Sequence, residues 1–278
     1  MSAIETPALT SADFQKISRL AYDQFGLNLP AGKETLVAAR LGKRMRLDGF
    51  RTFAEYYSHV QSDATGQALI HLIDALTTNF TSFLREPRHF EFLTKAVTGE
   101  FRDAASMRVW SAACSSGEEP YSIAMSLLDA ASRVKCAWRP AIKILATDIS
   151  TRVLDIARGA IYPAERFETL PDAWKHAYLL KGSGENRGKF KIRPEVASLV
   201  EFGRLNLMES LPSQGFQFVF CRNVMIYFDR PTQQRIVRRL AEVVLPGGYL
   251  FIGHSETLNG FDQPLRYVGP AIYRKEPR

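Results

Sequence analysis

Hydrophobic residues recur at helical spacing through roughly the first eighty residues of the chain. Phe14, Ile17 and Ala21 lie three or four positions apart, which predicts an amphipathic helix that ends near Gly26. Three further segments have the same texture, and they read KETLVAARLGKRMRL, TFAEYYSHV and TGQALIHLIDALTTNF. No segment in this part alternates with a period of two. We therefore predict a small all-helical domain over residues 1–88.

After about residue 105 the pattern changes to short apolar runs rich in Val, Ile and Phe. These predicted strands read MRVWSAA, AIKILATD, FQFVFCRN and GGYLFIGH. Helical patterns separate them, and they read PYSIAMSLLDAASRV, TRVLDIARGA and PTQQRIVRRLAEVVL. Strands that alternate with helices indicate a parallel sheet with right-handed crossovers. We predict a doubly wound α/β domain over residues 89–278.

One stretch interrupts this alternation at about residues 168–203. LPDAWKHAYLLKGSGENRGKFKIRPEVASLVEF predicts a short helix, then two short strands around a glycine-rich turn. Such an inserted hairpin is either a tolerated surface elaboration or a docking site. The second reading is open because a small exposed sheet offers an edge for an added strand.

Composition is that of an ordinary globular protein with a sizeable core. The chain has 278 residues, of which 46% are hydrophobic and 23% charged. The net charge of +7 points to an acidic partner: a nucleic acid, a membrane surface or an acidic protein.

Cysteine spacing and the amino-terminal sequence bear on the cellular compartment. Cys114, Cys136 and Cys221 are far apart, which suits reduced thiols and gives no metal-ligand spacing, so no metal site is expected. MSAIETPALT lacks the basic and apolar segments of a signal peptide. No apolar run approaches the ~18 residues needed to span a bilayer. We expect a cytoplasmic protein without membrane insertion.

The stretch RVWSAACSSGEEPYSIAM joins a predicted strand to a predicted helix through small side chains. Small residues allow a ligand to approach the backbone, but they also suit a tight turn between packed elements. The dinucleotide-binding pattern of three glycines is absent, because only Gly117 is present. Glu118 and Glu119 would repel a pyrophosphate at the helix entrance, although one of them also suits the helix dipole on its own. A cofactor with a cationic ammonium and sulfonium, S-adenosylmethionine, fits this stretch better.

Polar residues also follow two other predicted strands. Asp148 ends IKILATD, where dinucleotide folds hold ribose hydroxyls, but an acid there suits a helix cap equally well. Arg222 and Asn223 follow FQFVFC and precede an aromatic segment with Tyr227. Polar groups at the carboxyl ends of parallel strands belong to a ligand cleft. The alternative for Arg222 is a buried arginine paired with a carboxylate.

Five motifs, TTNFTSFLRE, RVWSAACSSGEEPYSIAM, ATDIS, FCRNVMIYFD and GGYLFIGHSE, carry a family resemblance over about residues 12–275. In order and spacing they resemble the chemotaxis receptor methyltransferases, the CheR family. Members transfer a methyl group from S-adenosylmethionine to glutamate side chains of bacterial chemoreceptors, giving methyl esters and S-adenosylhomocysteine. The resemblance implies a Rossmann-like, S-adenosylmethionine-dependent methyltransferase domain of α/β class. It also implies a small helical amino-terminal domain and an inserted β-subdomain, which agrees with the three textures above.

The resemblance implies roles for individual residues. Positions that match the family's cofactor contacts are Asn79, Thr81, Arg85, Glu119, Asp148, Asn206, Leu207, Arg222 and Asn223. Glu119 matches a contact to the methionyl end, Asp148 the ribose ligand, and Asn206 with Leu207 the adenine-side contacts. Tyr227 matches a tyrosine placed near the methyl group.

Methyl transfer to a carboxylate requires little acid–base chemistry. A glutamate with a pKa of about 4.3 is already ionised at neutral pH, so no general base is needed. Alignment and exclusion of water remain. Arginine and tyrosine side chains can hold one carboxylate oxygen while the other attacks. We therefore expect Arg85, Arg222 and Tyr227 to be catalytic.

The positive charge gathers on KETLVAARLGKRMRL. A helical wheel puts its basic residues on one broad side, and these are Lys33, Arg40, Lys43, Arg44 and Arg46. A solvated basic face needs no partner, but the resemblance implies one: the glutamate-rich methylation helices of a chemoreceptor. In some family members the hairpin insert also binds a peptide at the receptor's carboxyl terminus. The residues that lie where such a site would be are Lys181, Gly182, Gly184, Gly188 and Lys191.

Two other functions fit the sequence less well. A nucleic-acid methyltransferase that acts on base amino groups usually has an Asp/Asn-Pro-Pro-aromatic segment, whereas the comparable RNVMIYF has no proline. Aromatic residues also do not interleave with the basic helix as base-stacking platforms would. A non-catalytic module would keep the cofactor only as a ligand, but every matched position holds the expected residue type. We expect no nucleic-acid partner.

Overall fold

The computed structural model describes residues 8–135, 137–138 and 141–277. The start of the predicted non-secretory amino terminus, residues 1–7, and Cys136 lie outside the described residues. Backbone contacts divide the chain into two compact units. A helical unit comprises Met1–Asn79 with Ile226–Gln233, and a sheet unit comprises Phe80–Met225 with Gln234–Arg278. The sequence analysis placed the boundary at residue 88, and it did not anticipate the short return into the helical unit.

The four predicted helices of the amino-terminal region are confirmed. They are α1 (Ser11–Phe25), α2 (Glu34–Asp48), α3 (Phe53–Ser62) and α4 (Gln67–Leu76). Thr10 caps α1 by accepting a hydrogen bond from the Asp13 amide, and Gly26 ends it in the left-handed region. The apolar faces meet in a core that includes fully buried Ile17 and Leu41. Packing of these apolar faces against one another stabilises the helices.

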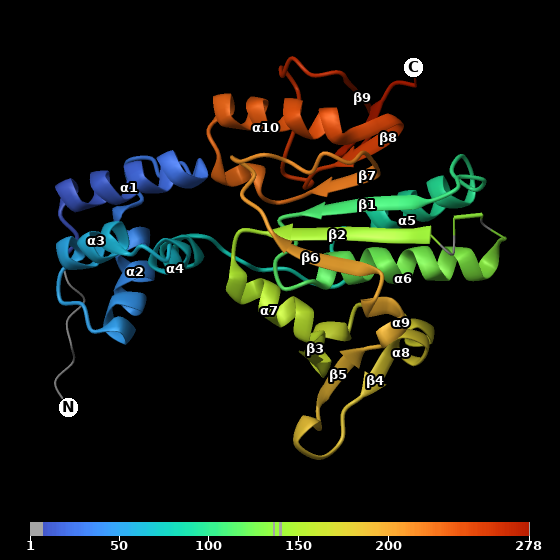
Figure 1. Cartoon of the computed structure of the whole chain (residues 1–278), viewed down its shortest axis with the longest axis horizontal. Helices are drawn as coiled ribbons and strands as arrows, with labels where there is room; N and C mark the ends of the chain where they lie inside the picture. Colours follow the sequence, from blue (N-terminus) through green and yellow to red (C-terminus); the bar gives the residue numbers. More distant parts are fainter. Residues whose placement is uncertain (1–7, 136, 139–140, 278) are drawn as a thin grey trace. The chain divides into compact units, whose positions relative to one another are not determined.

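The sheet unit contains a seven-stranded sheet in the order β6-β2-β1-β7-β8-β10-β9 (Figure 1). Its strands are β1 (Met107–Ala112), β2 (Ile142–Asp148), β6 (Val200–Arg204), β7 (Phe216–Cys221), β8 (Val244–Phe251), β9 (Leu265–Gly269) and β10 (Ile272–Lys275). β2, β1, β7 and β8 are parallel, as predicted, and β6 adds a fifth parallel strand, whereas β10 and β9 pair antiparallel. The α/β fold is therefore confirmed, and the sheet is mixed rather than wholly parallel.

Buried aromatic side chains fill the middle of this sheet. Phe220 of β7 stacks on Phe251 of β8 with ring centroids 4.3 Å apart, and Phe218 stacks on Tyr249. The flanking helices are α5 (Pro87–Thr98), α6 (Glu118–Arg133), α7 (Thr151–Gly159) and α10 (Arg230–Val243). α7 runs beside the β2–β6 end of the sheet (Figure 1). None of the helices in the described ranges is both long and apolar enough to cross a membrane.

The predicted insert forms a second, three-stranded antiparallel sheet in the order β3-β5-β4. Its elements are β3 (Ile161–Pro163), η2 (Ala164–Phe167), α8 (Asp172–Tyr178), β4 (Leu179–Lys181), η3 (Gly184–Asn186), β5 (Lys189–Ile192) and α9 (Pro194–Ala197). The predicted helix and hairpin are present. Two features differ: β3 adds a strand upstream, and Val200–Arg204 leaves the insert to pair with β2 as the edge strand β6. None of the residues of β6 is fully buried, so the strand lacks the long apolar run by which the other parallel strands were recognised.

Candidate active site

The predicted cofactor residues of the sheet unit gather at the carboxyl edge of the parallel strands. Ala113–Gly117 follow β1, Asp148 ends β2, Asn206 and Leu207 follow β6, and Arg222 follows β7. Because these strands are parallel neighbours, their carboxyl ends lie at the same edge of the sheet. This is the edge where open α/β sheets bind ligands.

The carboxylate of Asp148 joins the turn after β1 to the loop after β2. Its Oδ2 accepts a hydrogen bond from the Ser115 amide at 2.8 Å, and its Oδ1 accepts one from the Ser150 amide at 3.0 Å. Ser150, not Asp148, caps α7 by accepting from the Val153 amide. Asp148 therefore organises two loops at the cofactor edge, and its role as the cap of this helix is excluded.

The two glutamates of the opening motif have different partners. Glu118 is fully buried, accepts a hydrogen bond from the Ser116 hydroxyl, and forms an ion pair with Arg166 of the insert. Glu119 accepts from the Ser111 hydroxyl at 2.7 Å and pairs with Arg222. Glu118 thus ties the helix entrance to the insert, while Glu119 belongs to the network of the cofactor edge.

Arg222 is the buried, paired arginine that was the alternative reading of the sequence. Its side chain is 2% exposed and donates to Glu119 at 2.8 Å, to Glu86 at 2.9 Å and to the Arg85 carbonyl at 2.6 Å. Burial alone would raise the pKa of Glu86, but the Arg222 charge and hydrogen bond hold that pKa below its ordinary value. Two carboxylates therefore neutralise the guanidinium, while its buried Nε has no hydrogen-bond partner within the described residues.

Strained backbone concentrates at this edge. Seven described non-glycine residues have positive φ, and five of them belong to the site segments: Leu84, Glu86, Ala113, Ser115 and Asn223. Each such residue costs about 1–3 kcal/mol, and strain of this kind clusters at functional sites. Arg85 lies between two of them and donates to the Phe80 carbonyl at 3.0 Å, and nearby Thr81 is buried.

The remaining predicted residues divide between the two units. Asn206 and Leu207 are buried in the sheet unit, where the Leu207 carbonyl accepts a hydrogen bond from Arg239. Asn79 and Tyr227 belong to the helical unit. There the Tyr227 hydroxyl donates to the Thr78 carbonyl at 3.1 Å.

Comparison with known proteins decides the family. Residues 12–77 match the CheR methyltransferase all-alpha domain, and residues 79–273 match the CheR methyltransferase SAM binding domain. The chain belongs to the CheR methyltransferase family. It is 41% identical over 266 residues to chemotaxis protein methyltransferase 2 of Pseudomonas aeruginosa, covering 95% of this chain and 93% of that protein. It is 39% identical over 272 residues to the chemotaxis protein methyltransferase of Escherichia coli, covering 97% and 92%.

S-adenosylmethionine, the cofactor of this CheR domain, suits the groups that the structure presents. The turn after β1 offers little bulk, and Asp148 offers carboxylate oxygens suited to ribose hydroxyls. Glu119 and Glu86 supply negative charge near a cationic ligand, and the unpartnered Nε of Arg222 is a donor for a carboxylate. The carboxylates and the Arg222 Nε of this CheR site therefore match the ammonium and the carboxylate of the cofactor's methionine part.

Two residues of the CheR site were missed by the sequence analysis. Glu86 directly follows Arg85 in TTNFTSFLRE, and Glu256 ends GGYLFIGHSE, so both lie inside motifs that were already quoted. Glu256 could have been selected from the sequence, because it is an acidic residue that shortly follows a predicted strand and Gly253. Its carboxylate accepts hydrogen bonds from three backbone amides: Asn223 at 3.0 Å, Met225 at 2.8 Å and Gly253 at 2.5 Å.

Glu86 also lies beside His89 and His254, whose nitrogens and carboxylate oxygens come within 4.8 Å of one another. Burial, then the Arg222 charge, lowers the pKa of His89 to about 4, so this imidazole is neutral at physiological pH. Arg222 already forms an ion pair with Glu86, and its positive charge would repel a metal ion at this cluster. The cluster is therefore part of the arginine network of the CheR site.

Replacing Glu256 is expected to loosen the loop that carries Arg222 and Asn223. Glu256→Gln keeps the shape but turns one acceptor oxygen into a donor, so at least one backbone amide loses its acceptor. We expect the free energy of unfolding to fall by about 1–3 kcal/mol, measured by urea denaturation. Glu185→Gln, at an exposed carboxylate of the insert, is the matched control. Equal stability of the two variants would show that Glu256 does not hold this loop.

Proposed function

We propose that the protein is a cytoplasmic, S-adenosylmethionine-dependent methyltransferase that acts on glutamate carboxylates of bacterial chemoreceptors. The observation that carries this proposal is identity of about 40% to chemotaxis protein methyltransferases along nearly the whole chain. Support from the site is the arginine and carboxylate network at the carboxyl edge, which suits a cationic cofactor and an anionic acceptor. The products would be a glutamate methyl ester and S-adenosylhomocysteine, and the reaction would serve sensory adaptation.

The reaction requires a correctly placed carboxylate rather than a base. When bound, S-adenosylmethionine supplies a methyl group on a sulfonium, which is a good leaving group. Asp148 and Asn206 would hold the nucleoside end, and Glu119 would contact the methionyl end. The substrate glutamate is already ionised, so the chain orients it and keeps water away.

The structure divides the three predicted catalytic side chains by their chemistry. Arg222 is neutralised by Glu86 and Glu119, so we assign it to positioning those carboxylates and not to gripping the substrate. Arg85 is partly exposed, and its guanidinium has a carbonyl partner, Phe80, rather than a carboxylate. Arg85 therefore keeps the net charge that attracts a substrate carboxylate. Tyr227 belongs to the helical unit, and we keep it as a predicted catalytic residue.

Recognition of the acidic receptor helices is assigned to the exposed part of α2. Arg40 and Arg44 are half-buried, and their guanidinium groups bind within the helical unit, Arg40 to the Leu76 carbonyl and to Thr78, and Arg44 to Asp48. The solvent-exposed basic face of α2 therefore excludes Arg40 and Arg44 and is narrower than the helical wheel predicted. The exposed cations of this helix and its start are Lys33, Lys43 and Arg46.

Reversing the charge of the exposed face is expected to slow receptor methylation. Lys43→Glu with Arg46→Glu should lower the kcat/KM for receptor about 10-fold at low salt, because steering charges raise association rates by 10–10³. The affinity for S-adenosylmethionine should not change. The matched control reverses Lys95 and Arg133, which are exposed on helices of the sheet unit. The difference should vanish near 1 M salt, where the screening length is about 3 Å. A loss that persists there would rule out steering.

A second receptor contact is proposed at the insert. Its sheet order leaves β4 at an edge, next to the glycine turn that contains Gly182 and Gly184. An edge strand can accept an extended peptide as an added strand. Lys181 and Lys191 are exposed on this sheet and would favour an acidic peptide or its terminal carboxylate.

The test of the proposed function uses purified protein and radiolabelled S-adenosylmethionine. Chemoreceptor-bearing membranes and RNA are offered as separate acceptors. Base-labile label on the receptors is expected, because carboxyl methyl esters hydrolyse in base. Label on RNA alone would overturn the proposal, and so would base-stable label on the receptor.

A further inference from the structure

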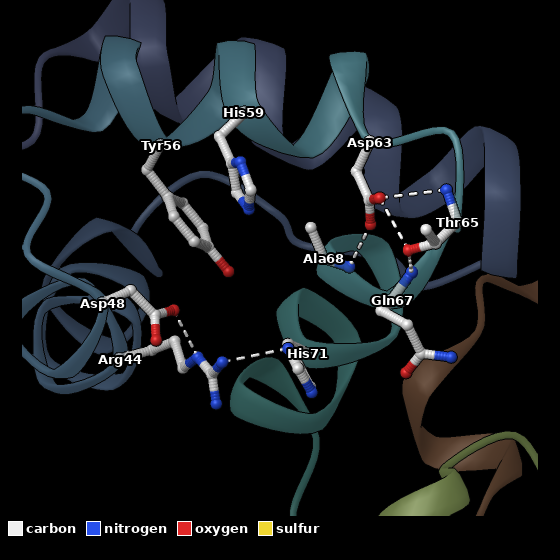
Figure 2. Close-up of a pocket in the computed structure, with 9 residues that line it drawn as sticks. All are labelled: Arg44, Asp48, Tyr56, His59, Asp63, Thr65, Gln67, Ala68 and His71. Atoms are coloured by element: carbon white, nitrogen blue, oxygen red, sulfur yellow. Dashed lines mark hydrogen bonds and ion pairs between the residues drawn. The ribbon is translucent and has the colours of Figure 1, made fainter.

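The helical unit contains a polar cavity that methyl transfer does not require. Its volume is about 300 Å³, and it is lined by residues of α2, α3, α4 and the loop between α3 and α4. Figure 2 shows Tyr56 and His59 projecting from α3 toward Arg44 of α2 and His71 of α4. None of the matched cofactor positions lines it.

The Tyr56 hydroxyl points into this cavity and lacks a partner. The side chain is 1% exposed, and its buried oxygen makes no hydrogen bond within the described residues. Burial, partly offset by the Arg44 charge, raises the pKa of Tyr56 to about 12, so the hydroxyl keeps its proton. A buried hydroxyl without an acceptor is unfavourable, and it calls for an acceptor inside the cavity.

Both carboxylates at the cavity are already engaged. Asp48 accepts from Arg44 Nε at 2.6 Å. Asp63 accepts from the Ala68 amide at 2.7 Å and from the Thr65 amide at 2.9 Å. These hydrogen bonds, that from Ala68 first, lower the pKa of Asp63 to about 2. The start of α4 thus stabilises one negative charge, and Arg44 compensates the other.

Besides the His59 ring and the Gln67 amide, the cavity lining includes donors of Arg44 and His71. Arg44 Nη2 lies 2.9 Å from His71 Nδ1. A guanidinium only donates, so Nδ1 accepts and Nε2 of His71 carries the hydrogen. Within the described part of the chain, no hydrogen bond uses Arg44 Nη1. The cavity therefore presents the Tyr56 hydroxyl, the His71 Nε2–H and one arm of a guanidinium.

We propose that this cavity binds the oxyanion of a small molecule, either a phosphate monoester or a carboxylate, through Tyr56, Arg44 and His71. These donors come from three helices that line the cavity, and a guanidinium arm forms the strong, charge-assisted bonds that such anions favour. The volume lies at the lower end of the range for small-molecule sites. The proposed anion site is independent of receptor methylation, because only residues of the helical unit line the cavity.

The test follows the ring resonances of His71 and His59 by NMR in the full-length protein during titration with inorganic phosphate and, separately, with acetate. A saturable shift is expected with at least one anion. Saturation by phosphate alone assigns the site to phosphate esters, and saturation by acetate alone assigns it to carboxylates. If neither anion saturates, the proposal is overturned.

A conservative variant separates this cavity from the general positive charge of the protein. Tyr56→Phe removes only the hydroxyl and should weaken anion binding about 10-fold, whereas Tyr57→Phe, outside the cavity lining, should not change it. Binding of S-adenosylmethionine by both variants verifies that they are folded. Equal anion affinity in Tyr56→Phe and the wild-type protein would overturn the proposal.

Discussion

Arg222→Ala is expected to destabilise the protein by about 3–5 kcal/mol, the usual cost of removing one partner from a buried ion pair. The guanidinium compensates Glu119 and Glu86, whose side chains are 11% and 14% exposed. Without it, the two largely buried carboxylates repel each other in a poorly hydrated site. The arginine also lies over the Phe90 ring, with its Cζ 5.8 Å from the centroid, so packing is lost together with charge.

Urea denaturation of the full-length variant measures this loss of stability. Methyltransferase activity is assayed separately, at a temperature where the variant is still folded. Arg266→Ala is the matched control, because that arginine forms an exposed ion pair with Glu276. Such pairs are worth about 0–1 kcal/mol. A triple variant with Arg222→Ala, Glu86→Gln and Glu119→Gln should recover part of the lost stability. An Arg222→Ala protein that unfolds within about 1 kcal/mol of the wild type would contradict the ion-pair account.

The loss should also depend on pH in a definite direction. In the wild-type protein the pKa of Glu86 is held below its ordinary value, so its contribution to stability is present above the unfolded pKa and is lost in acid. In Arg222→Ala, burial is opposed only by the smaller effects of the His254 backbone hydrogen bond and charge, so the pKa of Glu86 should rise. The variant is then penalised most at neutral pH. The difference in stability between the two proteins should narrow as the pH falls toward about 4, near the ordinary pKa of a glutamate.

Much of the fold follows from local sequence signals. The four amino-terminal helices carry apolar stripes, and α1 and α3 also have side-chain caps at their starts. The parallel strands are short apolar runs that need no partner to be recognised. The antiparallel strands β9 and β10 and the edge strand β6 were missed. They have only four or five residues and are mostly not buried, so pairing with a neighbour defines them rather than composition.

In the candidate site, too, some residues could be selected from their local sequence position, whereas their partners are brought together only by the tertiary structure. Asp148 and Arg222 could be selected because each ends or follows a strand of a parallel sheet, a position that sequence reveals. The partners of Arg222 could not be selected that way, since Glu86 is 136 residues distant along the chain. Arg40 and Arg44 illustrate the converse error, because a helical wheel treats every cation as solvated and does not see α4 packing beside them.

Gly117→Ala is expected to disrupt both the helix entrance and cofactor binding. Gly117 has a φ of 96°, which costs a residue with a side chain about 1–3 kcal/mol. An added Cβ would also lie 2.8 Å from Ala157 Cβ, 3.1 Å from its Cα and 2.9 Å from the Tyr162 hydroxyl oxygen. That hydroxyl donates to the Ser116 carbonyl, so moving it disturbs the turn itself. Overpacking adds roughly 1–3 kcal/mol, for a combined loss of about 2–6 kcal/mol.

Calorimetric titration with S-adenosylmethionine, next to denaturation, separates the two consequences of Gly117→Ala. We expect the dissociation constant to rise at least about 10-fold, which corresponds to 1.4 kcal/mol, because the turn that must admit the cofactor has moved. Gly159→Ala is the control: nothing lies within 4 Å of its added Cβ. That substitution at the end of α7 should be neutral or stabilising by about 0.4–1 kcal/mol. If Gly117→Ala bound the cofactor as tightly as Gly159→Ala, the small-residue turn would be a packing feature only, and the cofactor would be held from the other strand ends.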